Sequence, residues 1–428
     1  MIELDVCVER NGMMVPVGTI AGKDVSDAVF QYTDAYRQSY DAVSLSISLP
    51  LQENPFTPAH TACFFDGLLP EGFTRRSVAQ WMHVDEGNYL SILHGLGREC
   101  LGAIRVTERG DSQEASYEKV SFEHMRELAA EGTSKSTDLV IKSHLSLTGA
   151  SGKVGLYYAA DRNEWYLPHG TAASTHIVKQ SHVRLDGIVT NEQLCLLTAA
   201  RCGISIPSSF IVNTGKGGEN EILFATERYD RQIPKNGKCV SGLPCPMRLH
   251  QEDFAQAMGV PASEKYEHQT GFHMRNMFDI LRKHSANPIE DQLKLWDIIV
   301  FNFLIGNTDA HIKNFSLLYG PDLKSIRLAP AYDIVSTVVY EQSTRDMAFS
   351  IGGTWSLDEI DEEAFHRAAK DVNLGERIAM KRFKDMCERF SFSLASSAET
   401  LAEEGYTNVF NIKDRIMEYG GIGKVYNR

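Results

Sequence analysis

The sequence predicts an α+β fold of two lobes, with a strand-rich N-terminal part and an all-helical C-terminal lobe. The chain has 428 residues, which is too many for one compact core, so two or three domains are expected. Short alternating apolar runs dominate the first half, whereas apolar residues recur at helical spacing from about residue 250 onward. Because the strands precede the helices, we expect two lobes with a cleft between them.

The composition narrows the class of protein. It is 43% hydrophobic and 23% charged, as in an ordinary globular protein. The net charge of −13 argues that the protein surface as a whole does not bind nucleic acid, because phosphate binding needs clustered lysine and arginine. The eight cysteines are scattered without a C-x-x-C pair, which favours reduced thiols. The first residues, MIELDVCVER, do not resemble a signal peptide, and no apolar run approaches the ~20 residues of a membrane span. We therefore expect a cytoplasmic protein without a membrane partner.

Residues 1–109 are predicted to form a first domain of mixed strand and helix. The stretch LDVCVERNGMMVPVGTI places Asn11 and Gly12 between two alternating runs, which predicts a hairpin. AVSLSISLP alternates as a half-buried strand does, and GRECLGAIRV predicts another strand. FFDGLLPEGFTRRSVAQWM predicts a turn that leads into a helix, with Pro70 near its start.

Residues 110–232 are predicted to form a second domain, and residues 233–428 a third. GDSQEASYEK is polar and aperiodic, so it predicts a linker; strands follow within DLVIKSHLSLTGASGKVGLYYAADRNEWYLPHG, STHIVKQ and EILFATERYDR. NEQLCLLTAARCGI predicts a helix that Thr190 and Asn191 cap and that ends at Gly203. The third domain is predicted to be helical, from HQEDFAQAMG through EDQLKLWDIIVFNFLIG to the segments after Ser356.

Two polar residues follow the apolar segment LWDIIVFNFLI at a spacing that catalysis can use. GNTDAHIKNFSLLYG carries Asp309 and Asn314 as D-x-x-x-x-N, the spacing of a kinase catalytic loop. There the Asp receives the proton of the substrate hydroxyl and the Asn binds magnesium. Alone, this spacing is also typical of a surface turn. A second carboxylate, Asp333 in LAPAYDIVST, follows nineteen residues after Asn314, beyond an expected hairpin, and favours the catalytic interpretation.

Upstream segments offer candidates for binding the phosphates of a nucleotide. Lys179 in STHIVKQ is placed as the strand lysine of a kinase, and TGASGK, which ends at Lys153, is placed as its phosphate loop. The loop is neither a Walker A motif nor G-x-G-x-x-G, but Gly149 and Gly152 would let the backbone approach a phosphate closely. ILFATERYDR then leads toward the helical half, where an adenine-binding hinge would lie.

Seven segments in this order closely resemble the HipA family of bacterial serine/threonine kinases, which act as toxins in HipA–HipB-type toxin–antitoxin systems. They are FFDGLLPEG, LTGASGK, STHIVK, ERYDR, LHQEDFAQAMG, GNTDAHIKNFSLLY and LAPAYDIVST. The resemblance covers nearly the whole chain. It implies a two-lobed kinase-like fold, ATP and Mg²⁺ as cofactors, and protein substrates in translation such as aminoacyl-tRNA synthetases. It also implies a HipB-like helix-turn-helix antitoxin as partner, with operator DNA bound only through the antitoxin.

The resemblance implies a role for each matching residue. Asp309 would be the catalytic residue, and Asn314 and Asp333 the metal ligands. The residues implied to bind the nucleotide are Lys179, Lys153, Gly149, Gly152, Glu227, Arg228, Tyr229, His311 and Lys313. Ser146 matches the family's regulatory autophosphorylation serine. The family loop more often carries Gln-Glu before its lysine, so the role of Lys153 rests on a weaker match.

Several alternatives stay open at this point. His311 can stabilise transferred charge or shape the loop, and Lys313 can contact phosphate or form a loop salt bridge. Ser146 can be an ordinary strand serine, and Thr148 can take its place. The basic cluster Met380–Phe390 is typical of an amphipathic helix, although it could face DNA. For the whole protein, the rival functions are a small-molecule kinase and a non-catalytic corepressor of an antitoxin–operator complex.

Overall fold

The computed structural model describes residues 1–111, 113–131, 136–137, 139–140, 152–181, 185–235, 237–268 and 272–426. The residues group by contact into two compact units. The first unit comprises Met1–His182, Ala225–Ala262 and Leu317–Ser325; the second comprises Val183–Phe224, Ser263–Ser316 and Ile326–Arg428. Helices and strands both contribute substantially, which confirms the α+β class. The boundaries expected at residues 109 and 232 stay a prediction.

The first unit begins with a four-stranded sheet in the order β3-β2-β1-β4. Its strands are β1 (Ile2–Arg10), β2 (Met13–Gly22), β3 (Val29–Tyr32) and β4 (Ile104–Glu108). Asn11 and Gly12 both have positive φ, at 52° and 76°, as a tight hairpin turn requires, so the predicted hairpin is confirmed. The helices of this part are α1 (Asp34–Arg37), α2 (Pro58–Phe65), η1 (Asp66–Leu68), α3 (Gly72–Met82) and α4 (Tyr89–Leu96).

The strand predicted for AVSLSISLP is wrong, because side chains bind the backbone groups that a sheet would have used. The Tyr32 hydroxyl accepts a hydrogen bond from the Leu45 N–H (2.7 Å) and donates one to the Leu49 carbonyl (2.5 Å). The Ile47 N–H donates to Glu252 Oε1 at 3.1 Å. Only an isolated bridge between Ser46 and Leu49 remains. The alternation correctly identifies Leu45 and Leu49 as buried, but the segment is a folded loop.

A second sheet of the first unit contains the order β5-β7-β6-β8. Its strands are β5 (Ser116–Val120), β6 (Lys153–Ala159), β7 (Glu164–His169) and β8 (His176–Gln180), with α5 (Phe122–Glu131) after β5. The expected linker therefore contains part of a strand: Tyr117 is buried against Tyr157, and its hydroxyl donates to the Ala173 carbonyl at 2.7 Å. The predicted turn at residues 161–163 is confirmed, whereas residues 149–151 of the other predicted turn lie outside the described residues.

Short elements complete the first unit. β10 (Ile222–Glu227) carries the chain from the second unit into the first, between Phe224 and Ala225. Beyond it lie β11 (Arg231–Gln232), β12 (Cys239–Val240), β13 (Leu243–Pro244), β14 (Met247–Arg248), β15 (Gln251–Asp253) and α8 (Phe254–Met258), and later most of β16 (Ser316–Tyr319).

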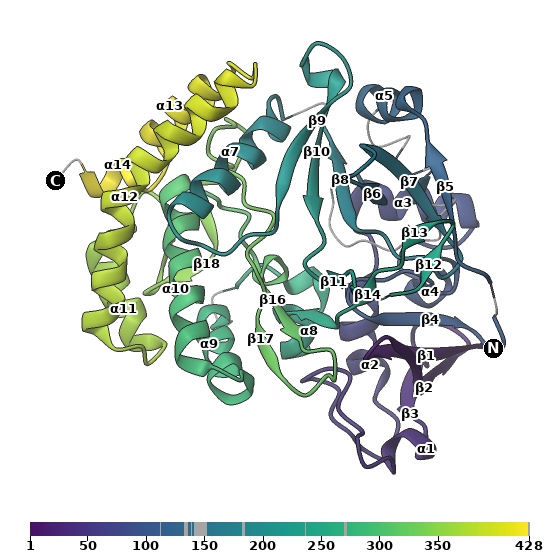
Figure 1. Ribbon diagram of the computed structural model, residues 1–428. Coiled ribbons are helices and arrows are strands. Elements are labelled where there is room, and N and C mark those ends of the chain that lie inside the picture. The colour runs from purple at the N-terminus through teal and green to yellow at the C-terminus, as the bar shows by residue number, and fades with distance from the viewer. Residues whose placement is uncertain are drawn as a thin grey trace. The chain divides into compact units, whose positions relative to one another are not determined.

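The second unit is mostly helical. Its helices are α7 (Ile188–Arg201), α9 (His273–His284), α10 (Pro288–Ile305), α11 (Glu362–Asp371), α12 (Glu376–Glu403), α13 (Val409–Tyr419) and α14 (Ile422–Tyr426). The long helix α12 packs against α7 and α10 (Figure 1). Phe303, Phe365 and Phe383 meet in its core, with Trp296 edge-to-face on Phe365. In the described part of the chain, no helix is long and apolar enough to cross a membrane.

The structure differs from two predictions: α7 starts earlier than predicted, and the C-terminal lobe is not entirely helical. α7 begins at Ile188 after Gly187, whose φ is 73°, and the Thr190 hydroxyl donates back to the Gly187 carbonyl instead of capping the helix. The region after residue 233 also contains the hairpin of β18 (Asp346–Ile351) and β19 (Thr354–Ser356). Gly352 and Gly353 turn this hairpin at positive φ, and a Cβ on Gly352 would lie 2.1 Å from the Ala364 carbonyl oxygen.

Candidate active site

The loop that carries Asp309 starts where the buried helix α10 ends. Gly306 terminates α10 in the left-handed conformation, with φ at 68°, and its N–H donates to the Phe303 carbonyl. A Cβ at this glycine would lie 2.4 Å from Cγ2 of Val338, so a larger residue does not fit. The sequence therefore ends the helix at a fixed point, and the polar loop leaves from a rigid support.

Asp309 lies exposed in this loop, and its backbone is held from both sides. Its N–H donates to Asn307 Oδ1 at 3.2 Å, and its carbonyl accepts from the His311 N–H at 2.8 Å. Asn307 is itself fixed by Asn302 of α10 through an Nδ2–Oδ1 hydrogen bond of 2.8 Å. An exposed carboxylate on a fixed backbone can meet a substrate hydroxyl without the loop having to reorganise.

Asn314 ends a single 3-10 turn, η4 (Ile312–Asn314), after Asp309. Its Nδ2 donates to the Asp309 carbonyl at 2.9 Å. Since the amide nitrogen is used in this way, the side-chain oxygen is the atom that Asn314 can offer to a cation. The predicted catalytic residue and the first predicted metal ligand therefore lie within one hydrogen-bonded loop.

Asp333 adopts a left-handed backbone conformation, with φ at 55°, which is uncommon for any residue other than glycine. The preceding residue, Tyr332, ties this segment to the η4 loop: its hydroxyl donates to the Lys313 carbonyl at 2.9 Å and lies 2.6 Å from Ser316 Oγ. The chain therefore turns at the second predicted metal ligand, in a backbone conformation that Asp adopts more readily than most residues.

A second set of hydrogen bonds joins the segment after Asp333 to the start of the loop that carries Asp309. The Thr308 N–H donates to Thr337 Oγ1 at 2.8 Å, and that hydroxyl lies 3.0 Å from the Gly306 carbonyl. Asn191 of α7 binds the backbone of Ser336 through both its side-chain atoms, at 2.9 and 3.1 Å. These buried supports were not singled out from the sequence, where isolated Thr, Ser and Asn residues carry no distinctive pattern.

The oxygen donors of this site suit a hard divalent cation whose coordination sphere is completed by other ligands. Among the residues that the structure describes, no three His, Cys, Asp or Glu side chains converge so as to hold a metal ion. An amide oxygen from Asn314 and a carboxylate from Asp333 are the ligand types that Mg²⁺ takes when phosphate oxygens and waters fill the remaining positions. Asn314 and Asp333 therefore carry the types of oxygen donor that would suit Mg²⁺, and their role as metal ligands stays a prediction.

His311 and Lys313, whose roles the sequence leaves open, are both 6% exposed. The His311 ring packs edge-to-face against Tyr266, with 5.2 Å between the ring centroids. Tyr266 was not predicted from the sequence, yet its hydroxyl donates a hydrogen bond to Asp309 Oδ1. Because 43 residues separate the two, sequence spacing gives no signal for this contact.

In the first unit, two of the predicted phosphate-binding lysines are neighbours. Lys153 of β6 is paired in register with Lys179 of β8. Gly152, just before Lys153, packs so closely that a Cβ there would lie 1.9 Å from Gln180 Nε2 and 2.7 Å from Ser136 Oγ. A larger residue at this position would therefore require the Gln180 and Ser136 side chains to move. Ser146, Thr148 and Gly149 lie outside the described residues.

The three predicted hinge residues, Glu227, Arg228 and Tyr229, differ in what they can contact. Glu227 is exposed, and the Tyr229 hydroxyl donates to Gln251 Oε1. Arg228 is buried, and its guanidinium binds both carboxylate oxygens of Asp230 at 2.8 and 2.9 Å. The Arg228 side chain therefore lies in the interior of the first unit, and the predicted hinge role of Glu227, Arg228 and Tyr229 stays a prediction.

Arg228 belongs to a buried charge cluster of the first unit. Its members are Glu9, Glu99, Arg228, Asp230, Arg231 and Arg248, joined by ion pairs of 2.5 to 3.4 Å. Burial alone would raise the pKa of Glu99, but the three guanidiniums outweigh it and lower that pKa to about 2. Glu99 pairs with all three arginines, so these ion pairs stabilise the interior of the first unit.

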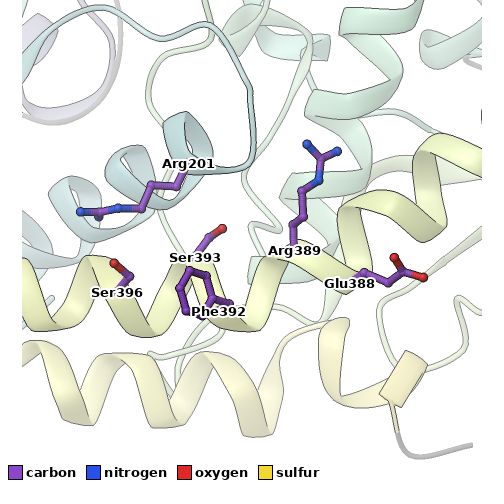
Figure 2. A pocket seen from close by; sticks show the side chains of 6 residues that line it. All are labelled: Arg201, Glu388, Arg389, Phe392, Ser393 and Ser396. Carbon is purple, nitrogen blue, oxygen red and sulfur yellow. The ribbon is translucent and has the colours of Figure 1, made fainter.

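A separate hollow of about 550 Å³ lies in the second unit between the C-terminal end of α7 and residues 388–396 of α12 (Figure 2). Its lining consists of Arg201, Glu388, Arg389, Phe392, Ser393 and Ser396. Arg201 is held in place by Ser397 and Thr400, at 2.6 and 2.8 Å. This hollow contains none of the predicted catalytic or nucleotide-binding residues.

The basic cluster Met380–Phe390 forms part of α12. Three of its basic side chains pair with acids of the same unit: Lys381 with Asp385, Arg382 with Asp297, and Lys384 with Glu362. Met380, Phe383 and Phe390 are buried on the opposite face. The segment is therefore an amphipathic helix, as its pattern predicts.

Comparisons with known proteins agree with this architecture. Residues 5–107 match the HipA N-terminal domain family, and residues 145–393 match the HipA-like C-terminal domain family. The Sinorhizobium fredii protein Y4mE is 31% identical over 396 residues, covering 90% of each chain. The serine/threonine-protein kinase toxin HipA of Shewanella oneidensis is 27% identical over 342 residues, covering 77% of this chain and 74% of the relative.

A solved structure has the same fold. It is the complex of Shewanella oneidensis HipA with HipB and operator DNA, which superposes with a TM-score of 0.79 at 22% identity. The match covers 99% of this chain and 97% of that chain.

Proposed function

Because the chain belongs to the HipA family, we propose that it is a protein serine/threonine kinase that uses ATP and Mg²⁺ and acts as the toxin of a toxin–antitoxin pair. The observation that carries the proposal is the loop in which Asn314 binds the backbone of Asp309, joined through Thr308 and Thr337 to the segment of Asp333. A carboxylate for the nucleophile and two oxygen ligands for a metal are what phosphoryl transfer needs from a protein.

In the proposed reaction, the hydroxyl oxygen of a serine or threonine attacks the γ-phosphorus of ATP. The bond from that phosphorus to the oxygen bridging the β- and γ-phosphates breaks, and ADP leaves. Asp309 accepts the proton of the attacking hydroxyl. Asn314 and Asp333 would hold Mg²⁺, which neutralises phosphate charge when bound. Lys153 and Lys179 would bind the phosphates, since two ammonium groups in register on adjacent strands suit a polyanion.

The proposal extends to substrate, partner and control. We expect the acceptor to be a component of translation such as an aminoacyl-tRNA synthetase, and the partner to be a HipB-like antitoxin that links the kinase to operator DNA. The Shewanella oneidensis complex of HipA, HipB and operator DNA supports this partner class. We also expect autophosphorylation at Ser146 to reduce activity.

Incubation of the purified protein with γ-labelled ATP, Mg²⁺ and a whole-cell lysate tests the function. The expected result is label on a protein band, lost with Asp309→Asn, because the near-isosteric amide cannot accept the proton. Label that appears only on small molecules would indicate a small-molecule kinase. ATP binding without any transfer would indicate a non-catalytic corepressor, and a folded Asp309→Asn protein with full activity would refute the role of Asp309.

A further inference from the structure

Tyr266 lies against the proposed catalytic residue. Its hydroxyl donates a hydrogen bond to Asp309 Oδ1, and its ring stands nearly perpendicular to the His311 ring, at 85°. All three residues belong to the second unit. The side chain of Tyr266 is nevertheless 42% exposed, so this contact lies at the surface, where a substrate can arrive.

The residue after Tyr266 fixes its place. The Glu267 N–H donates to the Ala348 carbonyl at 2.8 Å. The Glu267 carboxylate accepts hydrogen bonds from the N–H of Ser350 in β18 and from the N–H of His273 at the start of α9, both at 2.7 Å. One glutamate therefore joins a strand to a helix start, and the backbone of Tyr266 is held by both.

We propose that Tyr266 is a positioning residue that orients the carboxylate of Asp309 for proton transfer. The inference rests on the proposed function. A carboxylate on an exposed loop can rotate, and the hydrogen bond from Tyr266 to Oδ1 restricts that rotation, so the carboxylate keeps one orientation toward the substrate hydroxyl. His311 holds the tyrosine ring from its side, which gives this buried histidine a structural task in the site. Correct orientation of a catalytic group lowers the barrier to the chemical step and leaves nucleotide binding unchanged.

The same contact has a rival explanation with the opposite consequence. A tyrosine hydroxyl bound to the catalytic carboxylate could occupy the place of the substrate hydroxyl and so inhibit the enzyme. The anchoring of Glu267 to β18 and α9 favours positioning, because a residue that must leave with every turnover would not be fixed to two elements. Removal of the hydroxyl distinguishes the two explanations. The reaction should become slower if the hydroxyl orients Asp309, and faster if the hydroxyl blocks the place of the substrate.

The test is Tyr266→Phe, which keeps the ring on His311 and removes the hydroxyl. Tyr419→Phe is the matched control, since Tyr419 is 39% exposed on α13, outside the site. Transfer of label from γ-labelled ATP to lysate protein is measured against ATP concentration, and thermal unfolding is measured in parallel. We expect the rate at saturating ATP to fall about tenfold, the size expected for one hydrogen bond to a charged group. The KM for ATP and the unfolding temperature should stay the same, and the control should match the wild type.

Three outcomes would overturn the inference: an unchanged rate, a faster rate, or a loss of rate with an equal rise in KM or a lower unfolding temperature. If the wild-type protein transfers no label, the proposed function fails first. If the wild type is active and Tyr266→Phe is equally active, the kinase assignment stands and only the role of Tyr266 is lost.

Discussion

Lys153 and Lys179 stand opposite each other across the antiparallel strands β6 and β8. Side chains in register on such a pair point to the same face, with Cβ atoms about 5 Å apart, and like charges placed there destabilise the sheet. Lys179 is only 8% exposed. We propose that the phosphates of ATP bind beside these two lysines, because a polyanion suits two ammonium groups on one face of a sheet.

Replacement of Lys179 by methionine should therefore weaken ATP binding without unfolding the first unit. A charge-assisted hydrogen bond contributes about 1.5 to 3 kcal/mol, so the Kd for ATP should rise roughly 10- to 100-fold. Calorimetry with ATP and with AMP measures this, and the loss should be much smaller for AMP. Lys381→Met, an exposed lysine paired with Asp385 on α12, is the control. Equal losses for both nucleotides would mean that Lys179 does not contact the outer phosphates.

Two substitutions of Asp333 should have the same effect on ATP binding but different effects on stability. Asp333→Ala and Asp333→Gly should both abolish the Mg²⁺-dependent part of ATP binding and leave metal-free binding almost unchanged. The two variants should differ in stability, because alanine at φ 55° is strained by about 1 kcal/mol where glycine is not. Calorimetry with and without Mg²⁺, together with urea unfolding, checks both statements. Glycine and alanine variants of equal stability would argue against the left-handed conformation.

Ser146 should acquire a phosphate when the protein is incubated with ATP and Mg²⁺. A phosphoryl group adds about −1.5 to −2 charges and would compete with ATP for Lys153 and Lys179, so the modified protein should bind ATP more weakly. Mass spectrometry locates the phosphate, and the Asp309→Asn protein controls for contaminating kinases. Absence of phosphate on both Ser146 and Thr148, while substrate is labelled, would disprove this regulation and leave the catalytic assignment intact.

Arg228→Met should destabilise the protein by about 3 to 5 kcal/mol, because the buried carboxylates of Asp230 and Glu99 lose the guanidinium that pairs with them. Below the unfolding transition, ATP affinity should change little, since the side chain is enclosed within the first unit. Thermal unfolding and calorimetry provide the two readouts. A normal unfolding temperature combined with weak ATP binding would indicate that the Arg228 side chain contacts the nucleotide.

The stability of the first unit should fall as pH rises toward neutrality, owing to Glu252. Burial raises the pKa of Glu252 from 4.5 to about 7, although Ser46, Tyr319 and the Ile47 N–H donate to it. Between these values the folded state keeps a proton that the unfolded state has lost, so stability decreases with pH, by roughly 3 kcal/mol in total. Below pH 4.5 both states are protonated, and above pH 7 both are ionised.

Glu252→Gln isolates this contribution. Urea unfolding of both proteins at pH 5 and pH 7.5 should show the wild type losing stability relative to the glutamine variant as pH rises. Parallel curves for the two proteins would show that Glu252 keeps the same proton affinity in the folded and unfolded states.

Local features of the fold could be predicted because their causes lie within a few residues. Asn11-Gly12 specifies its hairpin by favouring positive φ, and the apolar spacing before Gly306 specifies α10 and its end. The strand predicted for AVSLSISLP failed for the opposite reason, since Tyr32 and Glu252 bind its backbone from distant parts of the chain. The alternating pattern predicted which residues are buried. It could not predict which groups form hydrogen bonds with the backbone of this segment.

The sequence by itself determined the family and which residues carry the proposed chemistry: Asp309 and Asn314 by their spacing, and Asp333 by its order in the chain. The tertiary structure decided what surrounds them. It set Lys153 in register with Lys179, enclosed Arg228 among carboxylates and brought the Tyr266 hydroxyl to Asp309. The reason is physical: a motif reflects chemistry between neighbours in sequence, whereas strand register, burial and contacts across 43 residues arise only when the chain packs.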